Sequence, residues 1–183
     1  MEKTKSAAGK FLDPEKIIAQ LEIAKKSVVA DFGCGPGYFT FPLIEAVGKE
    51  GMVFAFDILP QVLESIAGKA KLAGIHNLVA KRANLEKPGS AKLEDNCADW
   101  VVLKDILFQN QEKQIIIKEA YRVLKTGGRM LVVEWNSREF GVGPSAELRV
   151  DEAKLKELLV AENFSIEKEI EAGDFHYALV ARK

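Results

Sequence analysis

The feature that most constrains the fold is an apolar run that ends in three closely spaced glycines, VVADFGCGPGYFT at residues 28–40. Gly33, Gly35 and Gly37 take alternate positions. Glycine tolerates positive φ and lets another group approach the backbone, at a cost in conformational entropy. So much glycine at the end of a strand therefore indicates that something is held there. In an open parallel sheet, that place is a ligand site, because ligands bind outside the carboxyl ends of the strands.

Strands and helices alternate along most of the chain. Apolar runs predict strands at 27–32, 52–58, 77–84, 98–105 and 129–135, and helical spacing predicts helices at 14–24, 39–48, 60–73, 111–125 and 151–163. Asp13 is expected to cap the first helix, with Pro14 at its first position, and KTGG at 125–128 is expected to form a turn after the fourth helix. Several strands are apolar on both faces, which is typical of a parallel sheet with helices on both sides. Two last strands, 164–172 and 175–183, are separated only by Gly173 and Asp174 and predict a hairpin. The expected fold is an α/β, open, mostly parallel, seven-stranded sheet with a C-terminal antiparallel hairpin.

Length and composition predict a single domain at residues 13–183, preceded by a flexible tail at 1–12. The 26 basic and 27 acidic side chains nearly cancel, which does not favour nucleic acid or an anionic membrane as the partner. Apolar runs are too short for a membrane span, and the N-terminus lacks the pattern of a signal peptide. Cys34 and Cys97 are far apart and match no metal-ligand spacing. We therefore expect a cytoplasmic protein with free thiols and no metal site.

Two carboxylates accompany the glycine turn. Asp31 directly precedes it, where a carboxylate suits a cationic ligand group better than a pyrophosphate. Asp57 ends the second strand, 20 positions after Gly37, where a carboxylate can accept hydrogen bonds from both hydroxyls of a ribose; a strand-end cap is the alternative. The spacing G-C-G-P-G also differs from the G-x-G-x-x-G fingerprint of dinucleotide sites. A glycine turn, an acid for a cation and an acid for a ribose together indicate S-adenosylmethionine.

These segments resemble the motifs of class I S-adenosylmethionine-dependent methyltransferases, a family with a Rossmann-like fold. VVADFGCGPGYFT resembles the first motif, VFAFDI the second, RANLEK the third, CADWVVLKDIL the fourth and EAYRVLKTGGRMLVVEW the segment that leads into strand five. The resemblance runs from about residue 12 to the end. It is strongest to the small methyltransferases akin to those of ubiquinone and menaquinone biosynthesis, and all five motifs occur in order.

The resemblance implies a set of cofactor-binding residues, which are Asp31, Gly33, Cys34, Gly35, Gly37, Asp57, Ile58, Asn84, Leu85 and Lys104. Asn84 stands where the family usually has an Asp directed at the adenine amino group, and its amide oxygen can still accept that bond. Phe108 stands where close relatives often have a His, which argues against a histidine base there. Catalytic residues are not identified. Asp105 and Glu134 are candidates for a proton acceptor by position alone, and a surface ion pair of Lys104 with Asp105 is an equal alternative.

The predicted function is transfer of a methyl group from S-adenosylmethionine to an acceptor, most simply a small molecule; nucleic acid and protein acceptors stay open. One alternative is a protein that binds S-adenosylmethionine or its demethylated product without catalysis. A nicotinamide-dependent oxidoreductase is less favoured, because the glycine spacing and the hairpin argue against it. The loop at 137–150 is predicted to cover the cleft as a mobile lid, with Phe140 over an acceptor and Arg149 beside an anionic group on it, or, alternatively, to pack passively on the sheet edge. No catalytic role is expected for His176, and the oligomeric state is not predicted.

Overall fold

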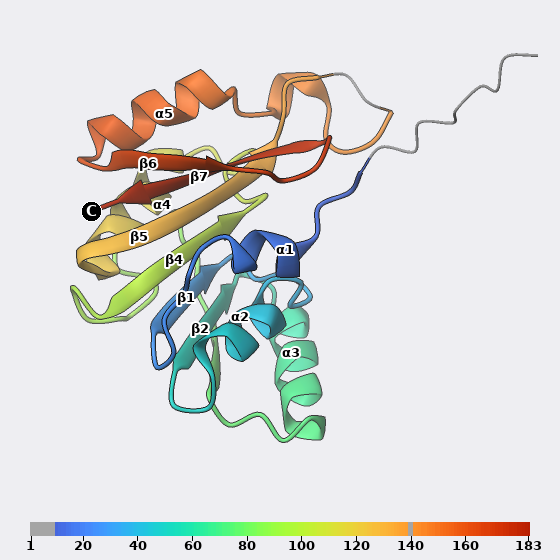
Figure 1. Cartoon of the computed structure of the whole chain (residues 1–183), viewed down its shortest axis with the longest axis vertical. Helices are drawn as coiled ribbons and strands as arrows, with labels where there is room; N and C mark the ends of the chain where they lie inside the picture. The colour runs from blue at the N-terminus through green and yellow to red at the C-terminus, as the bar shows by residue number, and fades with distance from the viewer. Residues whose placement is uncertain (1–9, 139–140) are drawn as a thin grey trace, which may run out of the picture.

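The computed structural model describes residues 10–138 and 141–183. Its centre is a seven-stranded sheet in the order β3-β2-β1-β4-β5-β7-β6, which Figure 1 shows with its flanking helices. The strands are β1 Val28–Phe32, β2 Met52–Asp57, β3 Leu78–Arg82, β4 Ala98–Lys104, β5 Leu124–Trp135, β6 Ser165–Ile170 and β7 His176–Arg182. The helices are α1 Pro14–Ala19, α2 Thr40–Val47, α3 Pro60–Leu72, α4 Lys113–Val123, α5 Glu152–Ala161 and a short 3-10 turn, Ala146–Leu148.

The first five strands are parallel, and the last two close the sheet in antiparallel fashion. β7 pairs antiparallel with both β5 and β6, as the short connection at Gly173 and Asp174 predicted. The chain leaves β1 toward β2 and β3 on one side and returns to β4 and β5 on the other. β1 and β4 are therefore the strands between which the order reverses, and this is where an open α/β sheet binds its ligand.

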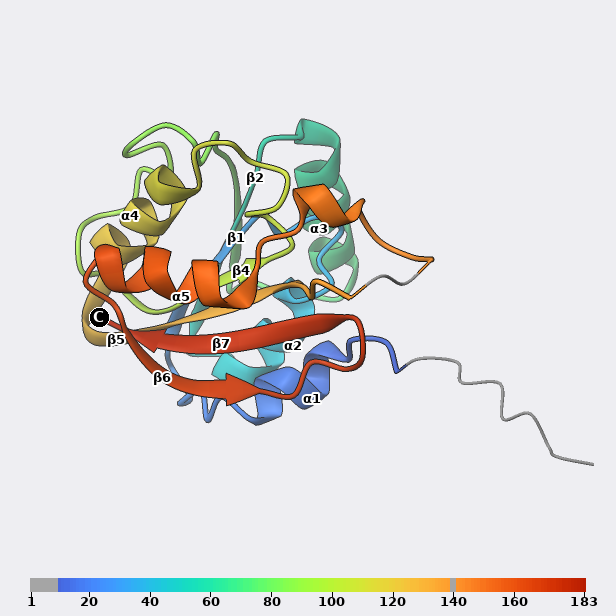
Figure 2. The same cartoon turned by 90° about the horizontal axis from the view of Figure 1, so that it is seen from above.

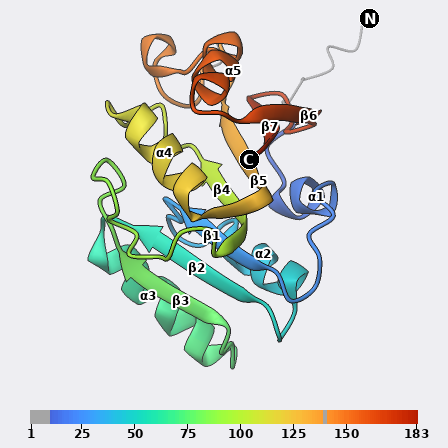
Figure 3. The same cartoon turned by 90° about the vertical axis from the view of Figure 1, so that its left-hand side faces the viewer.

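Helices cover both faces of the sheet, as the apolar strands predicted. On one face, α1 and α2 pack over β1 and β4 through Ile17 and Leu43, and α3 packs over β2 through Ile66. On the other face, α4 and α5 pack over β4 and β5 through Ile116 and Leu155. Figures 2 and 3 show the two layers of helices on opposite sides of the strands. Neither layer of helices covers the carboxyl ends of β1, β2 and β4, which lie together at one edge of the molecule.

One predicted turn is wrong. The sequence KTGG at 125–128 was expected to end a helix and precede a strand, but it forms part of the twelve-residue strand β5. The register against β4 shifts between Ala98 and Trp100, so these residues form a bulge. Gly127 has a φ of +78°, and backbone hydrogen bonds with Lys183 hold it and Gly128 beside the end of the chain. Pairing with distant strands therefore overrides the local turn signal.

The N-terminal edge of the domain is tied to the final hairpin. Asp13 caps α1 through its side chain, with Pro14 at the first helical position, as predicted. Before this cap, Leu12 is buried and the Lys10 carbonyl accepts a hydrogen bond of 2.9 Å from the Asp174 amide. Residues 10–12 thus pack on the domain, whereas the rest of the expected tail, 1–9, lies outside the described residues. The domain limit itself stays a prediction. None of the helices in the described ranges is long and apolar enough to cross a membrane.

Candidate functional site

Two adjoining hollows lie at the carboxyl ends of β1, β2 and β4. The β2-side hollow, of about 240 Å³, and the β4-side hollow, of about 210 Å³, share Gly33, Asp57 and Gln109 in their walls. Nine of the ten predicted cofactor residues line one or both of them, and these are Asp31, Gly33, Cys34, Gly35, Asp57, Ile58, Asn84, Leu85 and Lys104. Gly37 does not line either hollow. The fold therefore brings together residues that are up to 73 positions apart, from Asp31 to Lys104.

The glycines of the turn are needed for two different reasons. All three have positive φ. A Cβ at Gly33 would lie 2.7 Å from Cδ1 of Ile106, and one at Gly37 would lie 2.6 Å from Cε2 of Phe41, so neither position has room for a side chain. At Gly35, by contrast, a Cβ would meet no atom of the chain within 4 Å. Bare backbone at Gly35 therefore faces open space in the wall of the hollow, where a ligand can approach it.

Asp57 connects the end of β2 to this turn. One of its carboxylate oxygens accepts a hydrogen bond of 3.0 Å from the Gly35 amide, and the other accepts one of 3.0 Å from the Leu59 amide. Each carboxylate oxygen has lone pairs for more than one donor. Asp57 is half-buried at the junction of the two hollows. Its carboxylate can thus fix the glycine turn and also accept hydrogen bonds from a pair of ligand hydroxyls. The expected strand-end cap and the expected ribose contact are compatible with each other.

The β2-side hollow has the chemistry of a site for a flat, mainly apolar ring. Leu85 is buried, and Ile58 is 49% exposed at the rim. Asn84 Oδ1 accepts a hydrogen bond of 3.1 Å from the Glu86 amide, which fixes the amide group in one orientation. The Asn84 oxygen keeps a second lone pair for a ligand amino group. The residues present therefore fit an adenine.

Asp31 is the most buried carboxylate of the site, with 1% of the residue exposed. Burial raises the pKa of Asp31 to about 7, although a hydrogen bond from the Thr40 hydroxyl, 2.6 Å long, opposes this rise. A cationic ligand group beside Asp31 would stabilise its ionised form. Cys34, next in the wall, is buried as well, and burial raises the pKa of its thiol. A thiol held neutral in this way contributes backbone and volume to the site.

Lys104 and Asp105 form the far wall of the β4-side hollow. Their side chains make an ion pair, and Lys104 Nζ also lies 5.9 Å from the centre of the Tyr38 ring. The ion pair was the alternative to a ligand contact, but it does not exclude that contact, because both residues line the hollow. Tyr38, which is 52% exposed, was not predicted. Nothing in the sequence around Tyr38, one residue after the glycine turn, indicates that its side chain lines the hollow.

Glu134, the second candidate for a proton acceptor, lies in the interior. It does not line either hollow, and it has no exposed surface. One carboxyl oxygen accepts a hydrogen bond of 2.7 Å from the Leu107 amide. Burial, aided by the nearby Asp105 carboxylate, raises the pKa of Glu134 to about 8. Glu134 is therefore out of reach of a ligand in either hollow, and burial favours its protonated form.

His176 joins the candidate site against expectation. It begins β7, and its Nε2 lies 3.4 Å from the Asp105 carboxylate. The ring packs on Trp135, with the ring centres 4.2 Å apart, because β5 and β7 pair these two residues. The sequence signal that could have located His176 is the register of this antiparallel pair, which a single sequence does not define.

The loop predicted as a cover is cross-linked internally. The Arg149 guanidinium donates hydrogen bonds to the carbonyls of Asn136, Arg138, Val142 and Pro144. These hydrogen bonds explain the position of Arg149 without an anionic acceptor. Gly143, at a φ of +85°, lies so close to Trp135 that a Cβ would be 2.6 Å from the ring. Phe140, expected to cover an acceptor, lies outside the described residues.

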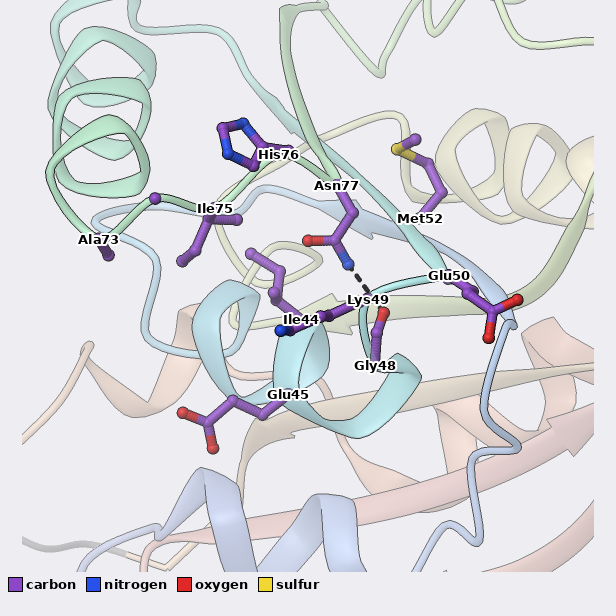
Figure 4. A pocket seen from close by; sticks show the side chains of 12 residues that line it. Ile44, Glu45, Gly48, Lys49, Glu50, Met52, Ala73, Ile75, His76 and Asn77 are labelled. Atoms are coloured by element: carbon purple, nitrogen blue, oxygen red, sulfur yellow. Dashed lines mark hydrogen bonds between the residues drawn. The ribbon is translucent and has the colours of Figure 1, made fainter.

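A larger hollow lies elsewhere, at the amino ends of β2 and β3. Figure 4 shows this cavity of about 730 Å³, with side chains of Ile44, His76 and Asn77 around it. Asn77 donates a hydrogen bond of 3.0 Å to the Gly48 carbonyl, which joins two of its walls. Because ligands of open α/β sheets bind at the carboxyl ends of the strands, the two smaller hollows are the better candidate site.

Comparison with known proteins identifies the family. The family model described as a methyltransferase domain matches residues 23–179. A demethylmenaquinone methyltransferase from Geobacillus stearothermophilus is 29% identical over 119 residues, which is 64% of this chain and 49% of that protein. One from Staphylococcus aureus is 31% identical over 121 residues, 66% of this chain and 48% of that protein. The chain thus spans about half the length of these relatives.

Among solved structures, a SAM-dependent methyltransferase from Aquifex aeolicus has the same fold. It superposes with a TM-score of 0.86 at 23% identity, covering 94% of this chain and 90% of the other. The family model covers most of the chain, including the glycine turn and both hollows. The chain therefore belongs to the methyltransferase family that its motifs resemble, the family whose cofactor is S-adenosylmethionine.

Proposed function

We propose that this protein transfers a methyl group from S-adenosylmethionine to a small-molecule acceptor. The observation that carries the proposal is the convergence of nine predicted cofactor residues on two joined hollows at the switch between β1 and β4. Asp57 would hold the ribose, Ile58, Asn84 and Leu85 the adenine, and Asp31 the cationic amino group. When bound, the cofactor supplies a methyl group on a sulfonium, which is already a strong electrophile.

The main task of the protein is then to orient the acceptor and exclude water. Lys104 and Tyr38 lie on the β4 side of the glycine turn, away from the adenine side, and we place the acceptor next to them. An exposed aromatic ring beside a cation suits an acceptor that combines a flat apolar body with a polar or anionic edge. Demethylmenaquinone, which appears in the names of the two relatives described above, is such a molecule. It is our first candidate acceptor.

The cytoplasm is the compartment we propose. Both cysteines, Cys34 and Cys97, are free thiols, as proteins of a reducing compartment usually have.

Calorimetry with S-adenosylmethionine, its demethylated product and NADH tests the cofactor; binding of NADH alone would favour an oxidoreductase. Turnover with demethylmenaquinone tests the reaction. The acceptor is offered in its reduced form, because a hydroquinone ring is electron-rich and a quinone ring is not. Cofactor binding without turnover on any acceptor would favour the non-catalytic alternative.

A further inference from the structure

Three titratable side chains near the β4-side hollow have buried polar atoms that lack partners. Oδ1 of Asp105, Oε2 of Glu134 and Nδ1 of His176 are all buried and have no hydrogen-bond partner within the described part of the chain. Buried polar atoms without partners are rare and costly, and they cluster at functional sites. These three side chains come from three neighbouring strand ends, after β4, in β5 and in β7. The fold therefore maintains this cluster at some cost.

Only one of the three reaches the hollow. Asp105 lines the wall, with 13% of its side chain exposed. His176 lies behind it, with 5% of its side chain exposed and its Nε2 at 3.4 Å from the carboxylate. Glu134 is buried and lines neither hollow. The cluster thus contains one accessible carboxylate, backed by one imidazole.

The backbone fixes this carboxylate in place. Asp105 has a φ of +52°, in the left-handed region that few residues other than Gly, Asn and Asp adopt. Its amide donates a hydrogen bond of 2.9 Å to the Val133 carbonyl of β5. The imidazole is held as well, because its ring packs on Trp135. Two supports on the same strand, the Val133 carbonyl and the Trp135 ring of β5, therefore set the distance between Asp105 and His176.

We propose that Asp105 accepts the proton that a neutral acceptor must lose and that His176, by donating its Nε2–H to that carboxylate, positions Asp105 to do so. This inference rests on the proposed methyl transfer and names the acceptor class: a molecule with an ionisable O–H group, such as a phenol or hydroquinone. The O–H proton goes to a carboxylate oxygen of Asp105, and its bonding electron pair stays on the acceptor. That pair, on the oxygen or delocalised to a ring carbon, forms the new bond to the methyl carbon, while the pair of the old bond stays on sulfur. Where a ring carbon is methylated, its hydrogen then leaves as a proton to the acceptor oxygen, and the ring becomes aromatic again.

The charges around Asp105 are consistent with this role. Lys104 Nζ pairs with its carboxylate from β4, His176 faces it from β7, and the buried Glu134 carboxyl of β5 lies near enough for the two acidic groups to interact. Carboxylates are common proton acceptors in catalysis, and the Lys104 cation attracts the negative charge of this one. Lys104 would also stabilise the negative charge left on the acceptor oxygen.

The first test needs no acceptor. The chain has two histidines, His76 and His176, so nitrogen-15 NMR of histidine-labelled protein resolves both rings. We expect His176 to carry its proton on Nε2 and not on Nδ1, and we expect that preference to weaken in Asp105→Asn. His76, exposed on the far side of the molecule, is the internal reference and should not change. A proton on Nδ1 in the wild type, or an unchanged His176 signal in Asp105→Asn, would overturn the proposed pair.

The second test measures catalysis with reduced demethylmenaquinone. Asn also tolerates positive φ, so Asp105→Asn should fold and bind S-adenosylmethionine like the wild type while kcat falls about 100-fold, as expected for a lost proton acceptor. His176→Phe keeps a ring on Trp135 but loses the donor, and kcat should fall about tenfold or more because the carboxylate is misplaced. His176→Gln, which restores an N–H donor, should recover most of that loss. His76→Gln is the matched control.

The outcomes separate this inference from the proposed function. A wild type that transfers no methyl group to any acceptor rejects the proposed function, and the catalytic role of the pair with it. An active wild type with unchanged kcat in Asp105→Asn rejects the pair alone. Equal losses in His176→Phe and His176→Gln reject positioning through the Nε2 donor. Calorimetry with S-adenosylmethionine on each variant shows whether the cofactor site is still folded.

Discussion

At the scale of single residues, Asp57 has two tasks that one substitution removes together. We expect Asp57→Ala to weaken binding of S-adenosylmethionine by roughly 1–3 kcal/mol, because the ribose loses a charged acceptor and the Gly35 amide loses its own. Calorimetry measures the change. Glu94→Ala, at an exposed position remote from the hollows, is the control. Equal affinity in Asp57→Ala and wild type would remove Asp57 from the site.

Gly35 tests whether the glycine turn holds a ligand or is only a turn. In Gly35→Val the side chain meets no atom of the chain within 4 Å at its Cβ, so it occupies the space of the hollow. We expect cofactor binding to be lost while the protein stays folded, with a strain cost of about 1–2 kcal/mol for a left-handed residue.

A matched control exists for this strain. Gly74 also has positive φ, at +66°, and open space at its Cβ, but it lies at the opposite edge of the sheet. Gly74→Val should therefore lose similar stability in thermal unfolding and still bind the cofactor. Normal binding in Gly35→Val would mean that the turn serves the fold alone.

Single residues also show where sequence reasoning succeeds. Asp31 and Asp57 were predictable because they end buried strands beside a glycine turn, a purely local pattern. His176 was not, because its meeting with Asp105 spans 71 positions and depends on the register of β7. Glu134 was expected near the cleft as the end of an apolar strand. It lies in the interior instead, since alternate residues of a strand point to opposite faces.

At the scale of elements, the loop between β5 and α5 depends on one side chain. The Arg149 fork holds four carbonyls at once, a geometry that an ammonium does not reproduce. Arg149→Lys should therefore speed amide hydrogen exchange across residues 141–150, by about tenfold for each 1.4 kcal/mol of lost hydrogen bonding. Arg138→Lys, exposed in the same loop, is the control. Exchange as slow as in the wild type would show that packing on Trp135 suffices to hold the loop.

Elements were predictable where the signal was local. The cap at Asp13, the helix stop at Gly48 and the hairpin at Gly173 are short patterns with a direct physical cause, and each lies where expected. The KTGG segment contradicts its local signal because β4 and the end of the chain pair with it. Whether the loop at 137–150 moves on ligand binding stays a prediction, which the exchange experiment also tests when cofactor is added.

At the scale of the whole molecule, the two best-buried carboxyl groups link folding to pH. Burial raises the pKa of Asp31 to about 7 and that of Glu134 to about 8, whereas the ordinary pKa values of these side chains, which apply to the unfolded chain, are 3.8 and 4.5. The folded state thus binds protons that the unfolded state has already released. Linkage then requires the free energy of unfolding to fall as pH rises. The stabilisation is complete below about pH 4 and is lost as pH rises through 7 to 8.

Glu134→Gln isolates one half of this effect. The amide keeps an oxygen for the Leu107 amide but has no proton to lose, so the variant should match or fall below the wild type near pH 5 and exceed it above pH 8. Each unit of pKa difference corresponds to about 1.4 kcal/mol. Urea denaturation at a series of pH values measures the free energy of unfolding for both proteins, with Glu94→Gln as the exposed control. The difference between variant and wild type cancels the contributions of other groups, such as Glu119, whose pKa is lowered. If that difference does not change between pH 5 and pH 8.5, Glu134 is ionised in the folded protein, and burial does not favour its protonated form.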